Sequence, residues 1–262
     1  MIEQDLKPLE EKSIYVIREA KLKFKNVAAL WSMGKDSTTM LALTRKAFLG
    51  KIPFPVIHID NGIDFPETYA FREWLSKKWN FKVIVGRSEI KPDPMGSACC
   101  GRNKPETLKK LLEEYGFDAL IVSIRRDEHG IRAKERYMSP RDRDFRWDYK
   151  NQPAELWDDY ASKLDAKEHM RVHPLLDWNE IDVWRYIKRE HIPVNPLYFS
   201  RNGFRYRSLG CTHCTVALKS NAKNVDDIIR ELRTTRQEER SGRSMDKEHE
   251  AAMERLRALG YM

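Results

Sequence analysis

The sequence predicts an α/β protein built on a doubly wound, mainly parallel sheet of five strands, with a mostly helical C-terminal subdomain. Short apolar runs of strand length alternate with longer segments in which apolar residues recur at helical spacing. This alternation is typical of parallel strands joined by right-handed helical crossovers. The 262 residues can bury one sizeable core, and we expect a first domain at 1–176 and the helical subdomain at 177–262.

The first third of the chain supplies two strand and helix pairs after an N-terminal helix. Residues 3–23 place apolar side chains at helical spacing. The apolar run "NVAALWSM" (26–33) predicts a buried strand, and "STTMLALTRKAF" (37–48) predicts the helix that follows it. A second strand is predicted at "FPVIHID" (54–60), and a second helix at "PETYAFREWLSKKW" (66–79), where the proline suits a first helical turn.

The later segments continue the same alternation. A third strand is predicted at "FKVIVGR" (81–87), and a helix at "KPETLKKLLEEYG" (104–116), which its final glycine would end. The fourth and fifth strands are expected at "DALIVSI" (118–124) and "RVHPLL" (171–176). Residues 125–170 between them are highly charged and lack clear periodicity, so we expect a functional insertion there. The helices of the C-terminal subdomain are expected at 179–190, 224–236 and 246–259.

Composition and charge narrow the class of protein. Hydrophobic residues make up 41% of the chain and charged residues 34%, the balance of a soluble globular protein. No apolar run approaches the roughly 20 residues of a membrane span, and the N-terminus lacks the layout of a signal peptide. We therefore expect a cytoplasmic protein with no membrane partner. The net charge of +8 is compatible with anionic partners such as nucleotides or nucleic acid, but a basic excess spread over a solvated surface is the preferred explanation.

The segment "SMGKDS", from Ser32 to Ser37, joins the first predicted strand to the helix after it. In an open α/β sheet, ligands bind at the carboxyl ends of strands, where a helix N-terminus presents N–H groups to an anion. Gly34 would let the backbone approach closely, and Lys35 adds a positive charge. We therefore expect a phosphate-binding loop. Its spacing is not that of a Walker loop, and an ordinary turn capped by Asp36 or Ser37 is the alternative.

These residues carry a resemblance to a known family. "SMGKDS" resembles the SGGKDS signature of the PP-loop ATP pyrophosphatases, which belong with the PAPS reductase superfamily. The similarity extends over nearly the whole chain to the small, catalytic subunit of bacterial ATP sulfurylase. It is carried by "IPFPVIHIDNG" (52–62), by 116–157, by "RVHPLLDWNEIDVWRYI" (171–187), by "RYRSLGC" (205–211) and by the final "LGYM". The chain lacks the insertion that those subunits carry before their "RxRxLGC" stretch.

The resemblance implies several properties together. They are a PP-loop fold for residues 1–176, binding of ATP and Mg²⁺, and adenylyl transfer with release of pyrophosphate. The sulfurylase similarity also implies a GTPase large subunit as partner. Catalytic roles are expected for Lys35, Asp36, Arg125, Arg126 and Asp127. Cofactor contacts are expected from Ser32, Met33, Gly34, Lys35, Asp36, Ser37, Asp60 and Arg132.

The residue types at the predicted strand ends suit this chemistry. Four arginines between 125 and 136 could bind phosphate, sulfate or nucleic acid in bidentate fashion, and Asp127 and Glu128 could orient them or bind Mg²⁺ through water. A solvated mixed-charge helix is the alternative. Asp60 would end the second strand, where it suits Mg²⁺ or ribose, or merely caps the next turn. Trp147, Trp157 and Tyr160 could stack on a base or simply pack within the insertion.

All four cysteines fall in two pairs, in "ACCG" and "GCTHCT". Four thiolates can complete the coordination of a four-iron cluster or of a zinc ion. The pairs resemble the CC…CxxC pattern of adenylylsulfate reductases and of DNA phosphorothioation adenylating proteins, which implies a [4Fe–4S] cluster. The implied ligands are Cys99, Cys100, Cys211 and Cys214. Zinc, or redox or structural thiols, are the alternatives.

The sequence leaves the acceptor of the adenylyl group open. The cysteines and the basic surface favour a phosphate oxygen of DNA, activated for sulfur insertion with a cysteine desulfurase as partner, and this is the expected reaction. Whole-chain similarity favours sulfate as the alternative acceptor. A sulfonucleotide reductase would need a further cysteine as nucleophile, and none follows Cys214. A non-catalytic nucleotide or nucleic-acid binding module would not need Lys35, Asp36 and Asp60 all to be present.

Overall fold

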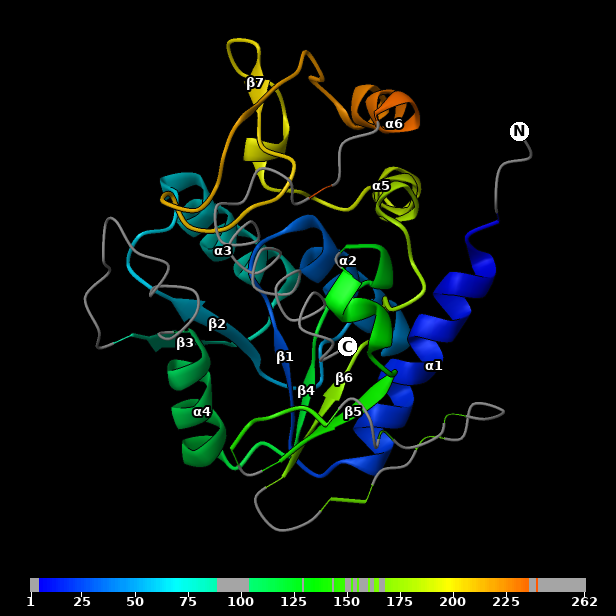
Figure 1. Ribbon diagram of the computed structural model, residues 1–262, viewed down its shortest axis with the longest axis vertical. Coiled ribbons are helices and arrows are strands. Elements are labelled where there is room, and N and C mark those ends of the chain that lie inside the picture. The colour runs from blue at the N-terminus through cyan, green and yellow to red at the C-terminus, as the bar shows by residue number, and fades with distance from the viewer. Residues whose placement is uncertain are drawn as a thin grey trace, which may run out of the picture.

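The computed structural model, drawn in Figure 1, describes part of the chain. The described residues are 5–88, 104–128, 130–142, 144–148, 152, 155, 160, 163–164, 168–235 and 239. The helices are α1 (Lys7–Lys23), α2 (Lys35–Ala47), α3 (Pro66–Trp79), α4 (Lys104–Tyr115), α5 (Glu180–Arg189) and α6 (Val225–Thr234). The strands are β1 (Val27–Leu30), β2 (Val56–Asp60), β3 (Val83–Arg87), β4 (Ala119–Ile121), β5 (Met138–Arg141), β6 (His169–Val172), β7 (Phe204–Arg205) and β8 (Leu218–Lys219).

The central sheet has six strands in the order β3-β2-β1-β4-β6-β5. The first five are parallel, and β5 pairs antiparallel with β6 at the edge. The α/β class and the mainly parallel sheet are confirmed, but the expected number of five strands was wrong. The missed strand, "MSPR", lies in the charged segment and has no apolar alternation. Its Arg141 is buried because it pairs with Glu135 at 2.6 Å, so a polar contact replaces the apolar pattern.

Helices cover both faces of this sheet, with α1 and α4 on opposite sides of it in Figure 1. Buried residues of α1, α2 and α3 form one large core cluster with one face of the strands. Buried residues of α4 form a smaller cluster with the other face. The alternation is visible in β1, where Val27 and Ala29 belong to the large cluster and Ala28 to the small one. This layering leaves the carboxyl ends of the parallel strands at one edge of the core.

The C-terminal part of the described chain packs against the same core. Val183 and Ile187 of α5 and Ile228 of α6 are buried in the large cluster. The segment was expected to be mostly helical, but α5, α6 and a short 3-10 turn make up less than half of its described residues, and it also holds the antiparallel hairpin of β7 and β8. The boundary proposed at 176/177 stays a prediction, and the helix expected at 246–259 lies outside the described residues. None of the helices that the structure describes is long and apolar enough to span a bilayer.

Gly86 in β3 tests how closely α4 packs on the sheet. A Cβ atom there would lie 2.6 Å from Cδ1 of Leu111 and 3.0 Å from Cγ2 of Thr107, both on α4. Gly86→Ala should therefore lower the free energy of unfolding by about 1–3 kcal/mol, because the closely packed side chains of α4 must shift to make room. Urea denaturation would measure the change. Val85→Ala, at a more exposed neighbouring position, is the control, and an equal loss in both variants would contradict this packing.

Candidate functional site

The loop Ser32–Ser37 connects the end of β1 to the start of α2. Gly34 is the N-cap residue of α2 and carries no side-chain cap. The hydroxyl of Ser37 lies 3.3 Å from both the backbone nitrogen and the hydroxyl oxygen of Ser32, so the loop closes around it. Met33 has a φ of 57°, in the left-handed region, and its side chain is buried. A non-glycine residue there costs about 1 kcal/mol, which the packing of the methionine offsets.

This loop forms one wall of a cavity of about 500 Å³. Ser32, Gly34, Lys35, Asp36 and Ser37 all line it. Leu30, Ile59 and Val122, which mark the carboxyl ends of β1, β2 and β4, also line it, as do Tyr198, Ser208, Leu209, Gly210 and Cys214 from the C-terminal part. The volume lies within the range of small-molecule sites, and the position is the one at which open α/β sheets bind ligands.

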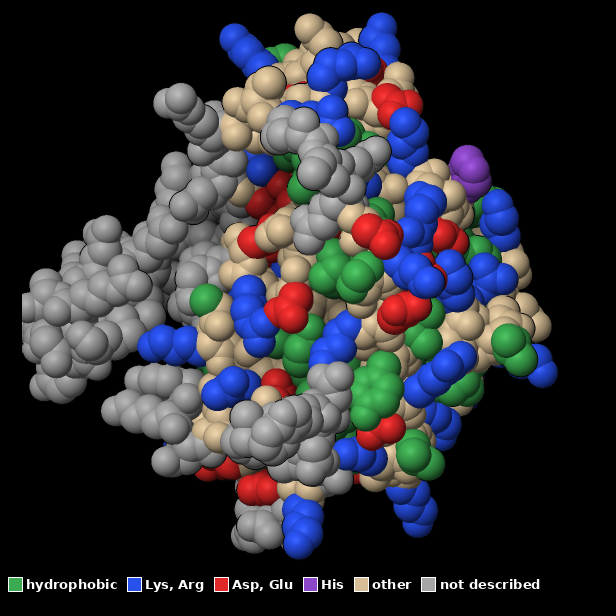
Figure 2. Space-filling model, turned by 90° about the vertical axis from the view of Figure 1, so that its right-hand side faces the viewer, with side chains coloured by type: hydrophobic (Ala, Val, Ile, Leu, Met, Phe, Trp, Pro, Cys, Tyr) green, Lys and Arg blue, Asp and Glu red, His purple; other side chains and the backbone are tan. Residues whose placement is uncertain are grey.

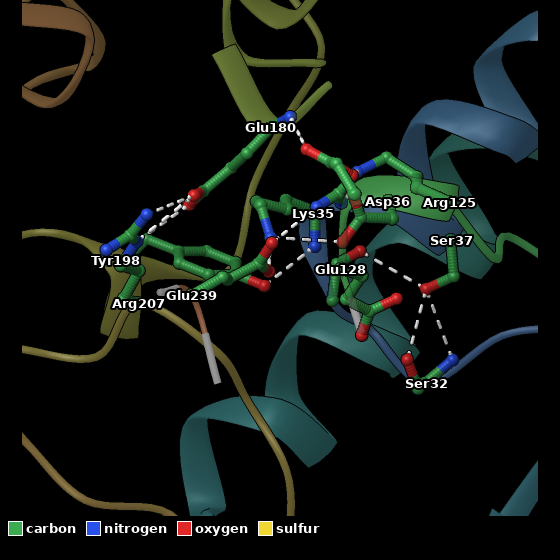
Figure 3. Close-up of polar contacts among 12 residues, drawn as sticks. Ser32, Lys35, Asp36, Ser37, Arg125, Glu128, Glu180, Tyr198, Arg207 and Glu239 are labelled. Atoms are coloured by element: carbon green, nitrogen blue, oxygen red, sulfur yellow. Dashed lines mark hydrogen bonds and ion pairs between the residues drawn. The ribbon is translucent and has the colours of Figure 1, made fainter. Parts of the chain in front are cut away.

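Behind the loop lies a buried cluster of charges, shown in Figure 3. Nζ of Lys35 lies 3.1 Å from a carboxylate oxygen of Asp36 and is also hydrogen-bonded to Glu239. The guanidinium of Arg125, fully buried, pairs with Asp36 and Glu239 in turn. Asp36 and Glu239 therefore each bridge the same two cations, and both bridges hold the start of α2 against the segment after β4.

Two further pairs extend this cluster to α5. Nε of Arg125 donates to Oδ1 of Asp127 at 2.9 Å, and Oδ2 of Asp127 accepts from the backbone N–H of Glu180 at 2.8 Å. The Glu180 carboxylate accepts from Arg207 at 2.7 Å and 3.1 Å. Asp127 thus satisfies a first-turn N–H of α5 and orients Arg125 at the same time. These ion pairs and the hydrogen bond to the first turn of α5 together connect the loop, the segment after β4 and α5.

The electrostatics keep these groups charged. Burial disfavours the ammonium of Lys35, but Asp36 and Glu239 outweigh it and raise the pKa of Lys35 above its usual value. Burial likewise opposes the carboxylate of Glu239, but Lys35 and Arg125 hold its pKa well below the usual range. Burial raises the pKa of Asp127, although Arg125 counteracts it. Lys35 is therefore a fixed positive charge, and it is unsuited to accept a proton.

The remaining predicted residues lie around the cavity or away from it. Arg132 lines the cavity and pairs with Glu128. Arg126 does not line it; it pairs with Asp177 and borders a separate cavity of about 400 Å³. Asp60 accepts from the Gly62 N–H at 2.7 Å and from the Tyr69 hydroxyl at 2.9 Å, and it does not line the cavity.

The partners of Asp60 define its environment. Burial opposes its charge, but the two hydrogen bonds and the nearby His58 and Arg72 lower its pKa below the usual value. This geometry matches a strand-end carboxylate that caps the next turn. Tyr160, considered for base stacking, is buried with its ring 5.9 Å from that of Tyr137, while Trp157 lies outside the described residues.

Sequence reasoning missed four residues that the fold brings to the loop. Tyr198 accepts a 2.8 Å hydrogen bond from the backbone N–H of Lys35. Glu180, Arg207 and Glu239 complete the charge cluster. "RYRSLGC" contains Arg207 and was recognised as a motif, but no role could be assigned to its arginines. Lys35 and Glu239 are 204 residues apart, so no local pattern signals their contact.

The thiols of Cys211 and Cys214 are both buried, and their Sγ atoms lie 3.2 Å apart. Cys214 also lines the cavity. Two adjacent buried thiols fit half of a four-thiolate centre. Cys99 and Cys100 lie outside the described residues, and within the described part no three His, Cys, Asp or Glu side chains form a metal-binding group.

Comparisons with known proteins agree with this geometry. The family model described as the phosphoadenosine phosphosulfate reductase domain matches residues 26–217. The chain is 41% identical to sulfate adenylyltransferase subunit 2 of Shewanella sp. (strain ANA-3) over an alignment of 293 residues. The alignment covers 98% of this chain and 97% of that protein. The same subunit of Photorhabdus laumondii matches with the same percentage identity and the same coverage of both chains.

Two solved structures share the fold. PAPS reductase from Candida auris, in a phosphate complex, aligns with a TM-score of 0.53 at 16% identity, covering 82% of this chain and 99% of that one. FMN adenylyltransferase from Candida glabrata, bound to FMN and an ATP analogue, aligns with a TM-score of 0.57 at 19% identity. The alignment covers 91% of this chain and 79% of that one. At these identities the similarity extends to the fold alone.

Proposed function

Because this chain belongs to the phosphoadenosine phosphosulfate reductase domain family and matches sulfate adenylyltransferase subunit 2 over nearly its whole length, we propose that it is the catalytic subunit of a sulfate adenylyltransferase. The reaction joins ATP and sulfate into adenylylsulfate and pyrophosphate. The observation that carries the proposal is the full-length similarity at 41% identity. The position of the Ser32–Ser37 loop on the wall of a ligand-sized cavity supports it.

The loop supplies the binding energy for the phosphates. The N-terminus of α2 directs N–H groups and a partial positive charge toward an anion. The hydroxyls of Ser32 and Ser37 line the same wall and can donate to phosphate oxygens. Lys35 adds a charge that burial among carboxylates keeps permanent. With the β and γ phosphates held there, the α-phosphorus faces the remainder of the cavity.

The chemistry then needs no side-chain nucleophile. A sulfate oxygen forms a bond to the α-phosphorus, and the bond from that phosphorus to the oxygen bridging the β-phosphorus breaks. The electron pair leaves with pyrophosphate, and no proton is transferred. Catalysis comes from holding the two anions in line and from stabilising the charge that develops on the leaving group.

ATP carries Mg²⁺ into such sites, and the cavity offers suitable oxygen ligands. The carboxylates of Asp36, Asp64 and Glu128 line it. Mg²⁺ prefers one or two carboxylates together with phosphate oxygens and water, so this donor set fits the ion. When bound, the ion would neutralise charge on the departing pyrophosphate. A GTPase large subunit, implied by the sequence resemblance, is the proposed protein partner.

DNA phosphate, the acceptor first expected from the cysteines, is less well supported than sulfate. Relatives that match nearly the full length, such as those of Shewanella and Photorhabdus laumondii, are sulfate adenylyltransferase subunits. Figure 2 shows Lys and Arg side chains spread over one face of the molecule with Asp and Glu among them. On the described part of that face, the basic side chains do not form a continuous stripe of the kind that binds a DNA backbone. The CxxC turn, whose Cys214 lines the cavity, still favours the DNA reaction.

Pyrophosphate release from ATP and Mg²⁺ tests the function directly. We expect release that depends on sulfate and is insensitive to added duplex DNA, measured with the GTPase subunit present. Release that DNA stimulates, and that falls steeply with salt as counterions compete, would instead identify a DNA acceptor. No pyrophosphate release with either acceptor would contradict an adenylyltransferase.

The [4Fe–4S] cluster is proposed on the four cysteines and has its own test. Protein purified without oxygen should contain iron and sulfide and absorb broadly in the visible range. Cys211→Ser should lower the iron content strongly, because it removes one of the four thiolates. Thr212→Ser, on the same turn, is the control. Colourless protein that contains zinc instead would contradict the cluster.

A further inference from the structure

Arg171 lies in the centre of β6, between β4 and β5. Its strand neighbours Met170 and Val172 are buried in the large core cluster. Arg171 is in register with Leu120, which belongs to the smaller cluster under α4. Side chains alternate along a strand, so Arg171 extends to the α4 face of the sheet. On this face the strands β1, β2 and β4 present apolar residues, whereas β5 places the polar Ser139 directly opposite Arg171.

No carboxylate neutralises this guanidinium in the described part of the chain. Nε of Arg171 is buried without a hydrogen-bond partner, and Arg171 makes no ion pair with any described residue. The carboxylate of Glu135 attracts it without a hydrogen bond; Oε1 of Glu135 accepts from Arg141 at 2.6 Å, and its Oε2 has no hydrogen-bond partner. Burial and the nearby Arg141 lower the pKa of Arg171 to about 10. Arg171 is half-buried, and a buried Nε without a hydrogen-bond partner is costly, which marks a place for a counterion.

The same arginine lines the cavity that the Ser32–Ser37 loop borders. Lys104, the first residue of α4, lines it too, and has no ion-pair partner among the described residues. Arg132 also lines it, but Glu128 neutralises that side chain. The cavity therefore has a second cationic wall, formed by strand β6 and helix α4 and separate from the phosphate loop.

We propose that Arg171, with Lys104, binds the tetrahedral oxyanion that attacks ATP. The proposal rests on the sulfate adenylyltransferase function and assigns the acceptor subsite within it. A guanidinium presents parallel N–H donors that match two oxygens of a sulfate dianion. The subsite would hold sulfate in the cavity whose loop binds the β and γ phosphates, so that one oxygen can approach the α-phosphorus.

Equilibrium dialysis with radiolabelled sulfate tests the subsite without turnover. Wild-type protein, saturated with a non-hydrolysable ATP analogue, should bind sulfate, and Arg171→Gln should weaken that binding at least about 10-fold. Binding of the ATP analogue itself should change less than about twofold, since the loop is intact. Arg201→Gln, an exposed arginine on the hairpin side, is the matched control and should bind sulfate normally. Wild-type protein that binds no sulfate would overturn the subsite.

The variants separate this proposal from the proposed function. Sulfate binding that is lost in Arg171→Gln, with no sulfate-dependent pyrophosphate release in the wild type, would support the subsite and refute the reaction. Sulfate-dependent release with an unchanged KM for sulfate in Arg171→Gln would refute the subsite and keep the reaction. If Arg171→Gln does not fold, Lys104→Gln at the surface-facing start of α4 provides the test, with a raised KM for sulfate and an unchanged KM for ATP as the expected result.

Discussion

Lys35→Met should slow pyrophosphate release from ATP by at least about 100-fold, because it removes a fixed positive charge from the wall that holds the phosphates. Nζ of Lys35 is buried between Asp36 and Glu239. Both neighbours are negatively charged, so neither can replace the positive charge that the substitution removes. Release at saturating ATP and sulfate measures the effect. Lys46→Met, at an exposed lysine that pairs with Glu10 and Glu190, is the control and should retain normal turnover.

A loss of activity through misfolding must be separated from a loss through catalysis. Lys35→Met alone leaves Glu239 buried with Arg125 as its remaining cation, which destabilises the fold. The double variant Lys35→Met/Glu239→Gln removes both charges and should recover much of the free energy of unfolding. Its pyrophosphate release should stay as low as that of the single variant. Turnover that recovers together with stability would show that Lys35 is structural and does not act on the phosphates.

Arg125→Met should lower the free energy of unfolding by about 3–5 kcal/mol, the largest stability effect expected in this protein. The Arg125 side chain is fully buried and pairs with Asp36, Asp127 and Glu239. Removing it leaves Asp36 and Glu239 to share Lys35 and takes from Asp127 the cation that it pairs with. Urea denaturation at neutral pH measures the loss. Arg201→Met, which removes an exposed pair, should change stability by less than about 1 kcal/mol.

The pH dependence of the free energy of unfolding gives a second test of this charge cluster. Glu239 has a depressed pKa in the folded protein, so its stabilisation is fully present above its unfolded pKa of about 4.5 and is lost as the pH falls below that value. The difference in unfolding free energy between wild type and Glu239→Gln should therefore be constant near neutral pH and shrink below about pH 4.5. A difference that grows on acidification would contradict the ion pairs of Glu239.

Local patterns predicted much of the fold. The apolar runs near residues 27–30 and 56–60 identified β1 and β2 because buried parallel strands are continuously apolar. The helix after β1 was expected at 37–48, and α2 begins two residues earlier, at Lys35. The edge strand β5 escaped prediction because its buried side chains include Ser139 and Arg141, which a period-2 apolar pattern does not detect.

Closeness in sequence predicted the placement of some site residues correctly and failed for others. Residues that are neighbours in sequence, such as Ser32 and Ser37, were grouped correctly as one loop, and they line one cavity wall. Arg125 and Arg126 are also neighbours, yet they diverge into different environments. The first is buried in the charge cluster, and the second pairs with Asp177 beside another cavity. Sequence adjacency cannot distinguish them, because the backbone leaving β4 directs successive side chains apart.

By itself the sequence determined the alternation of strands and helices, the small polar loop at the first strand end and the pairing of the cysteines along the chain. These features depend on residues within one or two helical turns of each other, where spacing alone decides which side chains share a face. Only the tertiary structure decided that Glu239 neutralises Lys35 and Arg125, that Tyr198 accepts from the loop, and that Arg171 lines the cavity without a counterion. Such contacts join segments far apart in sequence, so strand order, register and layer packing must exist before those charges can meet.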